Sequence, residues 1–102
     1  LMERLSPEDD ELLCRAILAL RDPADCRRFF ADLCTIQELH DLAQRVRVAR
    51  MLMDQANYKE ISRATGMSTA TISRVNRSLS YGTGGYRDVL DRVAADSQKG
   101  AD

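Results

Sequence analysis

The side chains best suited to chemistry in this sequence lie together between Ser68 and Arg77. They are small, hydroxylic or basic: Thr69, Ala70, Thr71, Ser73, Arg74 and Arg77. An ordinary surface helix mixes both charge signs, but no acidic residue occurs between Ile61 and Arg87. Small side chains permit close approach to base edges, and arginines reach further. The stretch is therefore typical of a helix that enters the major groove of DNA. The alternative is an amphipathic helix whose hydroxyl groups only face water.

A short helix before this stretch is expected to help position it. Asn57 and Glu60 form a capping-box-like pair at its start, which satisfies N–H groups of the first turn. Ile61 and Ala64 are its predicted inner face.

A glycine turn and a second helix follow. Gly66 can adopt the left-handed backbone conformation that lets the chain turn sharply. Ser68 is the predicted cap of the second helix, whose apolar residues recur at helical spacing: Ile72, Val75 and Leu79. Residues 57–79 are thus predicted to form a helix-turn-helix.

Charge is distributed unevenly along the chain. The total is −1, yet residues 1–41 carry −5, residues 42–87 carry +6 and the residues from 88 onward carry −2. Attraction to phosphate needs a local patch rather than a basic total. The basic segment contains the predicted helix-turn-helix, so the near-zero total is compatible with a nucleic-acid partner.

Capping signals predict two helices near the start of the chain, and no segment alternates as a strand would. Ser6-Pro7 begins the first, to about Arg21, and Asp22-Pro23 begins the second, to about Leu33. The predicted buried residues are Leu12, Leu13, Ala16, Ile17 and Leu20, then Cys26, Phe29, Phe30 and Leu33.

The longest periodic segment runs from Ile36 to about Met53, after a capping box of Thr35 and Glu38. Its predicted apolar stripe is Ile36, Leu39, Leu42, Ala43, Val46, Ala49, Leu52 and Met53. Val48 and Met51 fall outside that stripe, so the helix is apolar on more than one side. A chain of 102 residues buries only a modest core, which favours a homodimer.

A glycine-rich segment, residues 80–86, predicts a sharp reversal before a last helix. That helix is expected from Tyr86 to about Asp96, with Val89, Leu90 and Val93 facing the core and fraying from Gln98 onward.

Other function classes find little support in the sequence. The three cysteines, Cys14, Cys26 and Cys34, lack C-x-x-C spacing and are expected to be reduced core residues. His40, the single histidine, has no candidate catalytic or metal-binding companions. Neither an enzyme nor a metal or cofactor is expected. No apolar run approaches the roughly 18 residues of a membrane span and no signal peptide is visible, so a cytoplasmic protein is expected.

Three motifs resemble the YerC/YecD branch of the Trp-repressor superfamily: Lys59-Glu60-Ile61 leading to Thr65-Gly66, the run Ser68 to Arg77, and Tyr81-Gly82-x-Gly84-Gly85-Tyr86. Thr35 and the run Leu42 to Val48 also resemble the repressor's central region. The resemblance covers roughly Ser6 to Val93. It implies a single all-α domain over residues 1–102, with six helices, in which the first three interlock with those of a second copy. It also implies a two-headed dimer that binds double-stranded DNA at a palindromic operator.

The resemblance also implies site residues. The DNA-contacting positions of the family fall on Lys59, Ser62, Ser68, Thr69, Ala70, Thr71 and Ser73, to which the basic face adds Arg74 and Arg77. The counterparts of the tryptophan-holding residues look like Thr35, Arg45 and Arg74. Val75 stands where the tryptophan-binding repressor has glycine, so the pocket is expected to be vestigial and no small-molecule corepressor is expected.

Two functions of different classes follow from these patterns. The leading one is a sequence-specific, homodimeric, DNA-binding transcriptional regulator that does not respond to tryptophan. The second is a helical module that uses the same helix-turn-helix scaffold to bind another protein. Salt-sensitive binding to duplex DNA separates the two.

Overall fold

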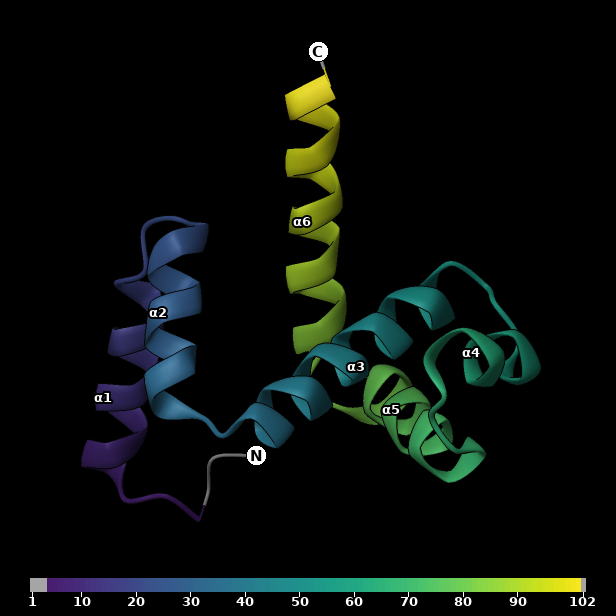
Figure 1. Ribbon diagram of the computed structural model, residues 1–102, viewed down its shortest axis with the longest axis horizontal. Coiled ribbons are helices and arrows are strands. Elements are labelled where there is room, and N and C mark those ends of the chain that lie inside the picture. Colours follow the sequence, from purple (N-terminus) through teal and green to yellow (C-terminus); the bar gives the residue numbers. More distant parts are fainter. Residues whose placement is uncertain (1–3, 102) are drawn as a thin grey trace. The chain divides into compact units, whose positions relative to one another are not determined.

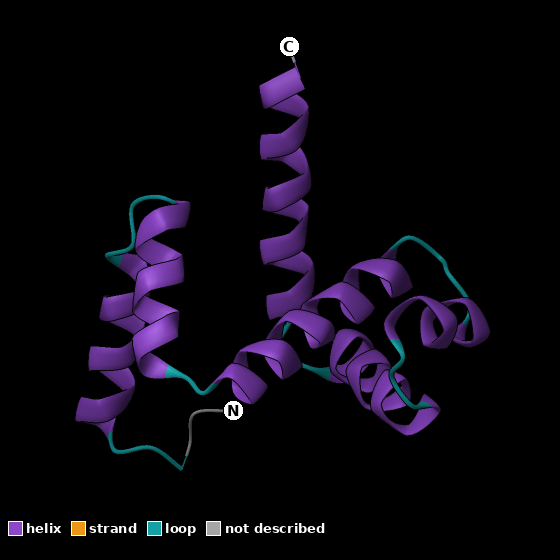
Figure 2. Cartoon of the chain, in the orientation of Figure 1, coloured by secondary structure: helices purple, strands orange, loops and turns teal. Residues whose placement is uncertain are grey.

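The computed structural model describes residues 4–101, and every regular element within that range is a helix (Figures 1 and 2). The six helices are α1 Pro7–Leu18, α2 Pro23–Leu33, α3 Ile36–Met53, α4 Tyr58–Thr65, α5 Thr69–Tyr81 and α6 Gly85–Ala101. The predicted all-α, six-helix fold is therefore confirmed. In the described range, no helix combines the length and the apolar character that crossing a membrane requires.

The chain divides into two compact units, one ending at Leu39 and one starting at His40. The first contains α1, α2 and the first turn of α3. The second contains the rest of α3 and α4 to α6. A single domain over residues 1–102 stays a prediction.

Local capping explains where the first two helices begin. Ser6 Oγ accepts the N–H of Asp9 at 3.1 Å, Asp22 Oδ1 accepts that of Asp25 at 2.8 Å, and a proline follows each cap. Both predicted starts are confirmed. Helix α2 also ends where predicted, whereas α1 ends at Leu18, before the predicted Arg21.

The predicted core of the first unit is wrong in part. No described residue of α1 or α2 is buried; Leu12 is 69% exposed, and Ile17, Leu33 and Cys14 are exposed as well. The other residues of this part of the chain that were predicted to be buried are partly buried: Leu13, Ala16, Leu20, Cys26, Phe29 and Phe30. The two phenylalanine rings pack edge to face, with centroids 5.6 Å apart. Two short helices are too small to enclose an apolar layer between them, so much of their apolar surface stays exposed to solvent.

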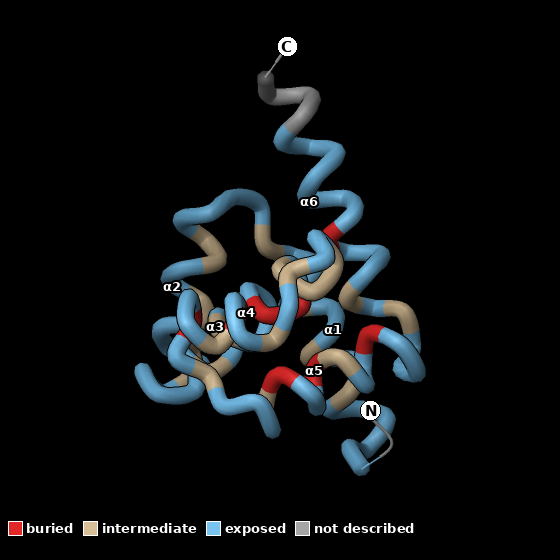
Figure 3. Tube along the Cα trace, turned by 90° about the vertical axis from the view of Figure 1, so that its right-hand side faces the viewer, coloured by how far each residue is buried: buried red, intermediate tan, exposed pale blue. Residues whose placement is uncertain are grey.

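The buried core lies in the second unit, where α3, α4, α5 and α6 all contribute (Figure 3). Its members are Val48, Ala49, Ile61, Ile72, Val75, Leu79 and Leu90. Among the residues of α6 whose burial is described, Leu90 is buried and Tyr86 packs against the core, whereas Val89 and Val93 are exposed, contrary to prediction.

Helix α3 has the predicted bounds but a different buried face. Val48, predicted to lie outside the main stripe, is fully buried, whereas Ile36 is 88% exposed. Leu42 and Val46 of the predicted stripe are also exposed. The other helices of the second unit cover the side of α3 that carries Val48 and Ala49, and Met51, Leu52 and Met53 pack against the same core. The prediction that α3 is apolar on more than one side is therefore confirmed.

Glycines produce the predicted reversal between α5 and α6. Gly84 has a positive φ of 88°, and a Cβ at Gly82 would lie only 2.3 Å from the carbonyl oxygen of Ser78. Helix α5 runs two residues past Leu79, and α6 begins one residue before Tyr86. The backbone of α6 stays helical to Ala101, beyond the predicted end near Asp96 and through the segment expected to fray.

Candidate nucleic-acid interface

The helix-turn-helix has the geometry that its capping signals predict. Asn57 Oδ1 accepts the N–H of Glu60 at 2.9 Å, and Asn57 Nδ2 donates to the Glu60 carboxylate at 2.7 Å. Gly66 caps the end of α4 in the left-handed conformation, with φ 73°. Ser68 then caps α5, so α4 and α5 have fixed ends around a turn of three residues.

The inner face of this motif differs from the prediction at one position. Ala64 is exposed, and the next residue, Thr65, is buried in its place beside Ile61. The hydroxyl of Thr65 donates to the carbonyl of Ile61 at 2.7 Å and accepts the N–H of Met67 at 3.1 Å. A buried threonine is tolerated because its hydroxyl is fully bonded. Ile72, Val75 and Leu79 of α5 are buried as predicted.

Further side-chain hydrogen bonds hold the turn. Ser62 Oγ donates to the carbonyl of Met67 at 2.9 Å, and Gln44 Nε2 of α3 donates to the carbonyl of Thr65 at 3.1 Å. Both residues fall within the motifs quoted above, but the sequence predicted no role for the side chain of Gln44 or of Thr65. Their contact spans 21 residues, so no local pattern could have revealed it.

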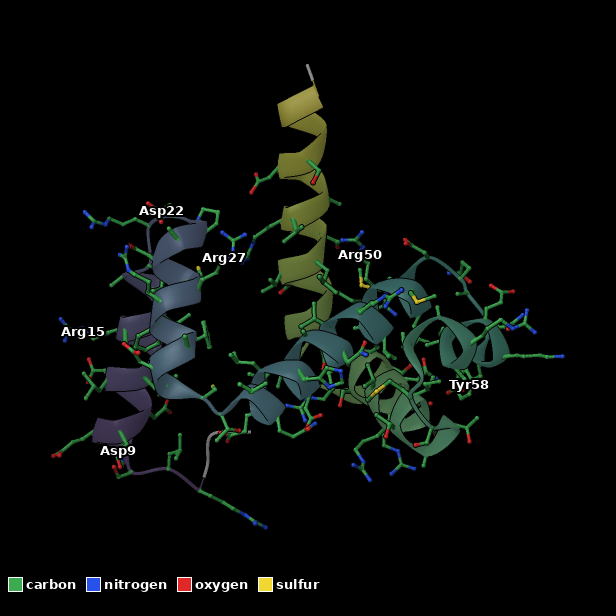
Figure 4. The ribbon with its side chains drawn as sticks, viewed as in Figure 1. Asp9, Arg15, Asp22, Arg27, Arg50 and Tyr58 are labelled. Carbon is green, nitrogen blue, oxygen red and sulfur yellow. The ribbon has the colours of Figure 1, made fainter. Side chains whose placement is uncertain are left out.

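The outer face of the motif is exposed and basic. Its exposed members are Lys59, Ser68, Thr69, Ala70, Ser73, Arg74 and Arg77, while Ser62 and Thr71 are partly buried. Nitrogen-bearing side chains extend outward from α4 and α5 (Figure 4). Most of the predicted contact residues are therefore accessible on the second unit.

Basic side chains on this face are free of carboxylate partners. Within residues 4–97, the ion pairs all lie at or before Asp41: Arg15–Glu11, Arg21–Asp25, Arg28–Asp25 and His40–Asp41. Lys59, Arg63, Arg74 and Arg77 form none. Unpaired cations maintain a positive local potential, which attracts a polyanion. Arg63 was missed by sequence analysis, although its position four residues after Lys59 places both on one side of α4.

The residues of the predicted vestigial pocket have separate surroundings. Thr35 Oγ1 accepts the N–H of Glu38 at 3.1 Å, and the Glu38 carboxylate accepts the N–H of Thr35 at 2.9 Å. The hydrogen bond from the Thr35 N–H to the carboxylate, and after it the interaction of the carboxylate with the Thr35 side chain, hold the pKa of Glu38 below its ordinary value. Arg45 and Arg74 are exposed, whereas Val75 is only 3% exposed, within the core. The pocket itself stays a prediction.

Other titratable groups do not gather into a site in the part of the chain that the structure describes. No three His, Cys, Asp or Glu side chains there could hold a metal ion together. The three cysteines are free thiols. A hydrogen bond to the Asp10 carboxylate raises the pKa of Cys14, which lowers the reactivity of that thiol.

An all-helical fold with a helix-turn-helix at its fourth and fifth helices is typical of the Trp repressors. Similarity to known proteins assigns the chain to the same class. The chain belongs to the Trp repressor protein family, whose sequence pattern matches residues 8–94. It is 50% identical over 92 residues to YerC, an uncharacterized protein of Bacillus subtilis (strain 168), covering 90% of this chain and 88% of that protein. The predicted family is thus confirmed.

Two solved structures share the fold. A TrpR-like protein from Eubacterium eligens is 49% identical, with a TM-score of 0.84 over 88% of this chain and 93% of that one. A candidate Trp repressor from Staphylococcus aureus is 43% identical, with a TM-score of 0.86 over 91% of this chain and 93% of that one.

Proposed function

We propose that this protein is a sequence-specific, DNA-binding transcriptional regulator that acts as a homodimer and does not respond to tryptophan. The observation that carries the proposal is the outer face of α4 and α5, which is exposed, basic and free of ion pairs among the described residues. A rigid motif with this charge suits a phosphate backbone, and its small side chains suit base edges. Membership of the Trp repressor family supports the same function.

The contact residues divide by reach and position. Thr69, Ala70 and Thr71 form the first turn of α5, the end of a recognition helix that enters the groove, and their methyl groups suit thymine. Lys59 and Arg77 are long exposed cations that meet phosphates more readily than bases. Ser62, Ser68, Ser73 and Arg74 complete the proposed interface.

A second copy of the chain is the proposed partner of the exposed apolar side chains. They include Leu12, Leu18, Leu33, Ile36, Leu42, Val46, Val89 and Val93. Within the second unit, a groove of about 400 Å³ is lined by residues of α3 and α6, among them Met53, Leu90 and Val93. Monomers rarely expose so much apolar surface without a partner. Sedimentation at micromolar concentration is expected to show a dimer, and a folded monomer would contradict the proposal.

Tryptophan is not expected to regulate the protein. The side chain of Val75 belongs to the core between Ile72 and Leu79, so it occupies space that glycine would leave open. Making room in a packed site for a ring typically costs about 1–3 kcal/mol. Arg45 and Arg74 are then available to DNA or to helix packing.

The deciding experiment selects binding sites from a random duplex pool and titrates the enriched duplex against a random one over a range of salt. A regulator of this kind enriches a palindromic site with half-sites about 34 Å apart and binds it more weakly as salt rises. The competing interpretation, a helical module that binds another protein, predicts neither enrichment nor salt-dependent duplex binding.

A further inference from the structure

Gln44 joins the long helix α3 to the turn of the helix-turn-helix. Its Nε2 donates to the carbonyl of Thr65 at 3.1 Å, in a partly buried contact between residues 21 positions apart. Thr65 is the last residue of α4, and the last carbonyls of a helix have no partner within it. Gln44 therefore supplies, from another helix, a bond that α4 cannot make for itself.

The carbonyl group of Thr65 lies at a turn that several further hydrogen bonds stabilise. Thr65 Oγ1 bonds to the carbonyl of Ile61 and the N–H of Met67, Ser62 Oγ donates to the carbonyl of Met67, and the N–H of Gly66 donates to the carbonyl of Ser62 at 2.8 Å. These contacts fix the turn to α4. The hydrogen bond from Gln44 fixes the turn to α3 as well.

We propose that Gln44 is a positioning residue, which sets the recognition helix α5 against α3 and thereby governs discrimination between DNA sequences without touching DNA. This inference rests on the proposed function. Contacts to bases require the short side chains of Thr69 and Thr71 to lie at a defined depth in the DNA groove. A displacement of about 1 Å lengthens a donor–acceptor distance enough to break the hydrogen bond. Long flexible cations such as Arg77 reach phosphate across a wider range of positions.

Ser62 takes a second role under this proposal. Its one hydroxyl hydrogen is donated to Met67, so it has none left for a phosphate oxygen, which only accepts. Ser62 thus acts together with Gln44 on the geometry of the turn, and only its oxygen lone pairs remain for a donor on a base.

The test compares Gln44→Met, which keeps the shape and removes the donor, with Gln44→Lys, which keeps an N–H donor of similar reach. Gln55→Met is the matched control, because Gln55 is an exposed residue after α3 whose side chain forms no hydrogen bond within the described residues. Three quantities are measured: amide exchange at Gly66 and Met67 without DNA, the ratio of affinities for the enriched and random duplexes, and the salt slope.

Gln44→Met is expected to speed exchange at both amides about threefold or more and to lower the affinity ratio about threefold to tenfold, the effect of losing one hydrogen bond. The salt slope should stay unchanged, since no phosphate contact is lost. Gln44→Lys should restore most of the ratio, and Gln55→Met should match the wild type.

Several outcomes would overturn the inference. One is wild-type exchange or an undiminished affinity ratio in Gln44→Met, and another is an equal loss of the ratio in Gln44→Lys, since the donor would then be irrelevant. Failure of the proposed function gives a different result from failure of this inference. In that case the wild type itself would not discriminate between the two duplexes, and no variant of Gln44 could change the affinity ratio. If Gln44→Met does not fold, Gln44→Ala, which also lacks the donor and suits a helix, takes its place, and an undiminished affinity ratio in Gln44→Ala would overturn the inference.

Discussion

Two hydrogen bonds join Ser68 and Thr71 at the start of α5. Ser68 Oγ accepts the N–H of Thr71 at 3.2 Å, and the Ser68 hydroxyl donates to Thr71 Oγ1 at 3.1 Å. One side chain thus caps the recognition helix and orients the hydroxyl of a proposed base contact. Thr71 retains its own hydroxyl hydrogen for a base acceptor.

Substitution of Ser68 is expected to separate these roles. Ser68→Ala should lower the free energy of unfolding by about 1 kcal/mol, the usual effect of losing a cap. Ser68→Asp should keep the cap and most of the stability, yet bind DNA more weakly because its charge repels phosphate. Denaturant unfolding and duplex titration of both variants measure the two effects. Equal affinity of Ser68→Asp and wild type would place Ser68 away from the DNA.

Arg77 and Thr69 should affect binding in different ways. If the dimer neutralises about six phosphates, log K against log salt falls with a slope near −5, and Arg77→Ala should make it shallower by about two, one per subunit. Its loss of affinity should be similar on all duplexes. Thr69→Ala should keep the slope and change the preferred sequence, with about 1–3 kcal/mol at stake per good base contact. Similar effects of both variants on slope and specificity would contradict the proposed division.

Val75→Gly tests both the core and the proposal that the protein does not respond to tryptophan. Removing a buried side chain and placing glycine inside α5 should lower the free energy of unfolding by about 2–4 kcal/mol. Calorimetry with free tryptophan should show no micromolar binding to the wild type. Val75→Ala controls for loss of volume without the backbone freedom of glycine. Tight tryptophan binding by the wild type would reverse the interpretation of Val75.

Gln55→Gly is expected to stabilise the protein by up to about 1 kcal/mol. Gln55 has a φ of 71°, and the N–H groups of Gln55 and Ala56 donate to the carbonyls of Leu52 and Met51, a helix end that normally uses glycine. Removing the side chain relieves left-handed strain, partly offset by the greater freedom of glycine in the unfolded chain. Thermal unfolding measures the change, and Gln55→Val, with a branched side chain, should shift it in the opposite direction.

Local signals predicted the helices well because their causes act within a few residues. The caps Ser6, Asp22, Asn57 and Ser68 each bond to an N–H group three positions along the chain. Burial depends on which helices meet, so the periodicity of α3 could not show that Val48 rather than Val46 faces the core. The hydrogen bond from Gln44 to Thr65 joins residues 21 positions apart, on α3 and α4, and has no sequence signature.

The reversal of the chain after α5 also limits which substitutions its three glycines tolerate. Any side chain at Gly82 meets the backbone of Ser78, which cannot move aside without unwinding the helix end, whereas a Cβ at Gly85 would meet only the Thr83 hydroxyl, at 3.5 Å. Gly84 has open space around it but a left-handed φ that disfavours side chains. Random mutagenesis with selection for folding should therefore recover alanine at 85 readily, at 84 rarely and at 82 only alongside a compensating change. The backbone of Ser78 thus restricts position 82, the left-handed φ restricts position 84, and neither constraint applies at position 85.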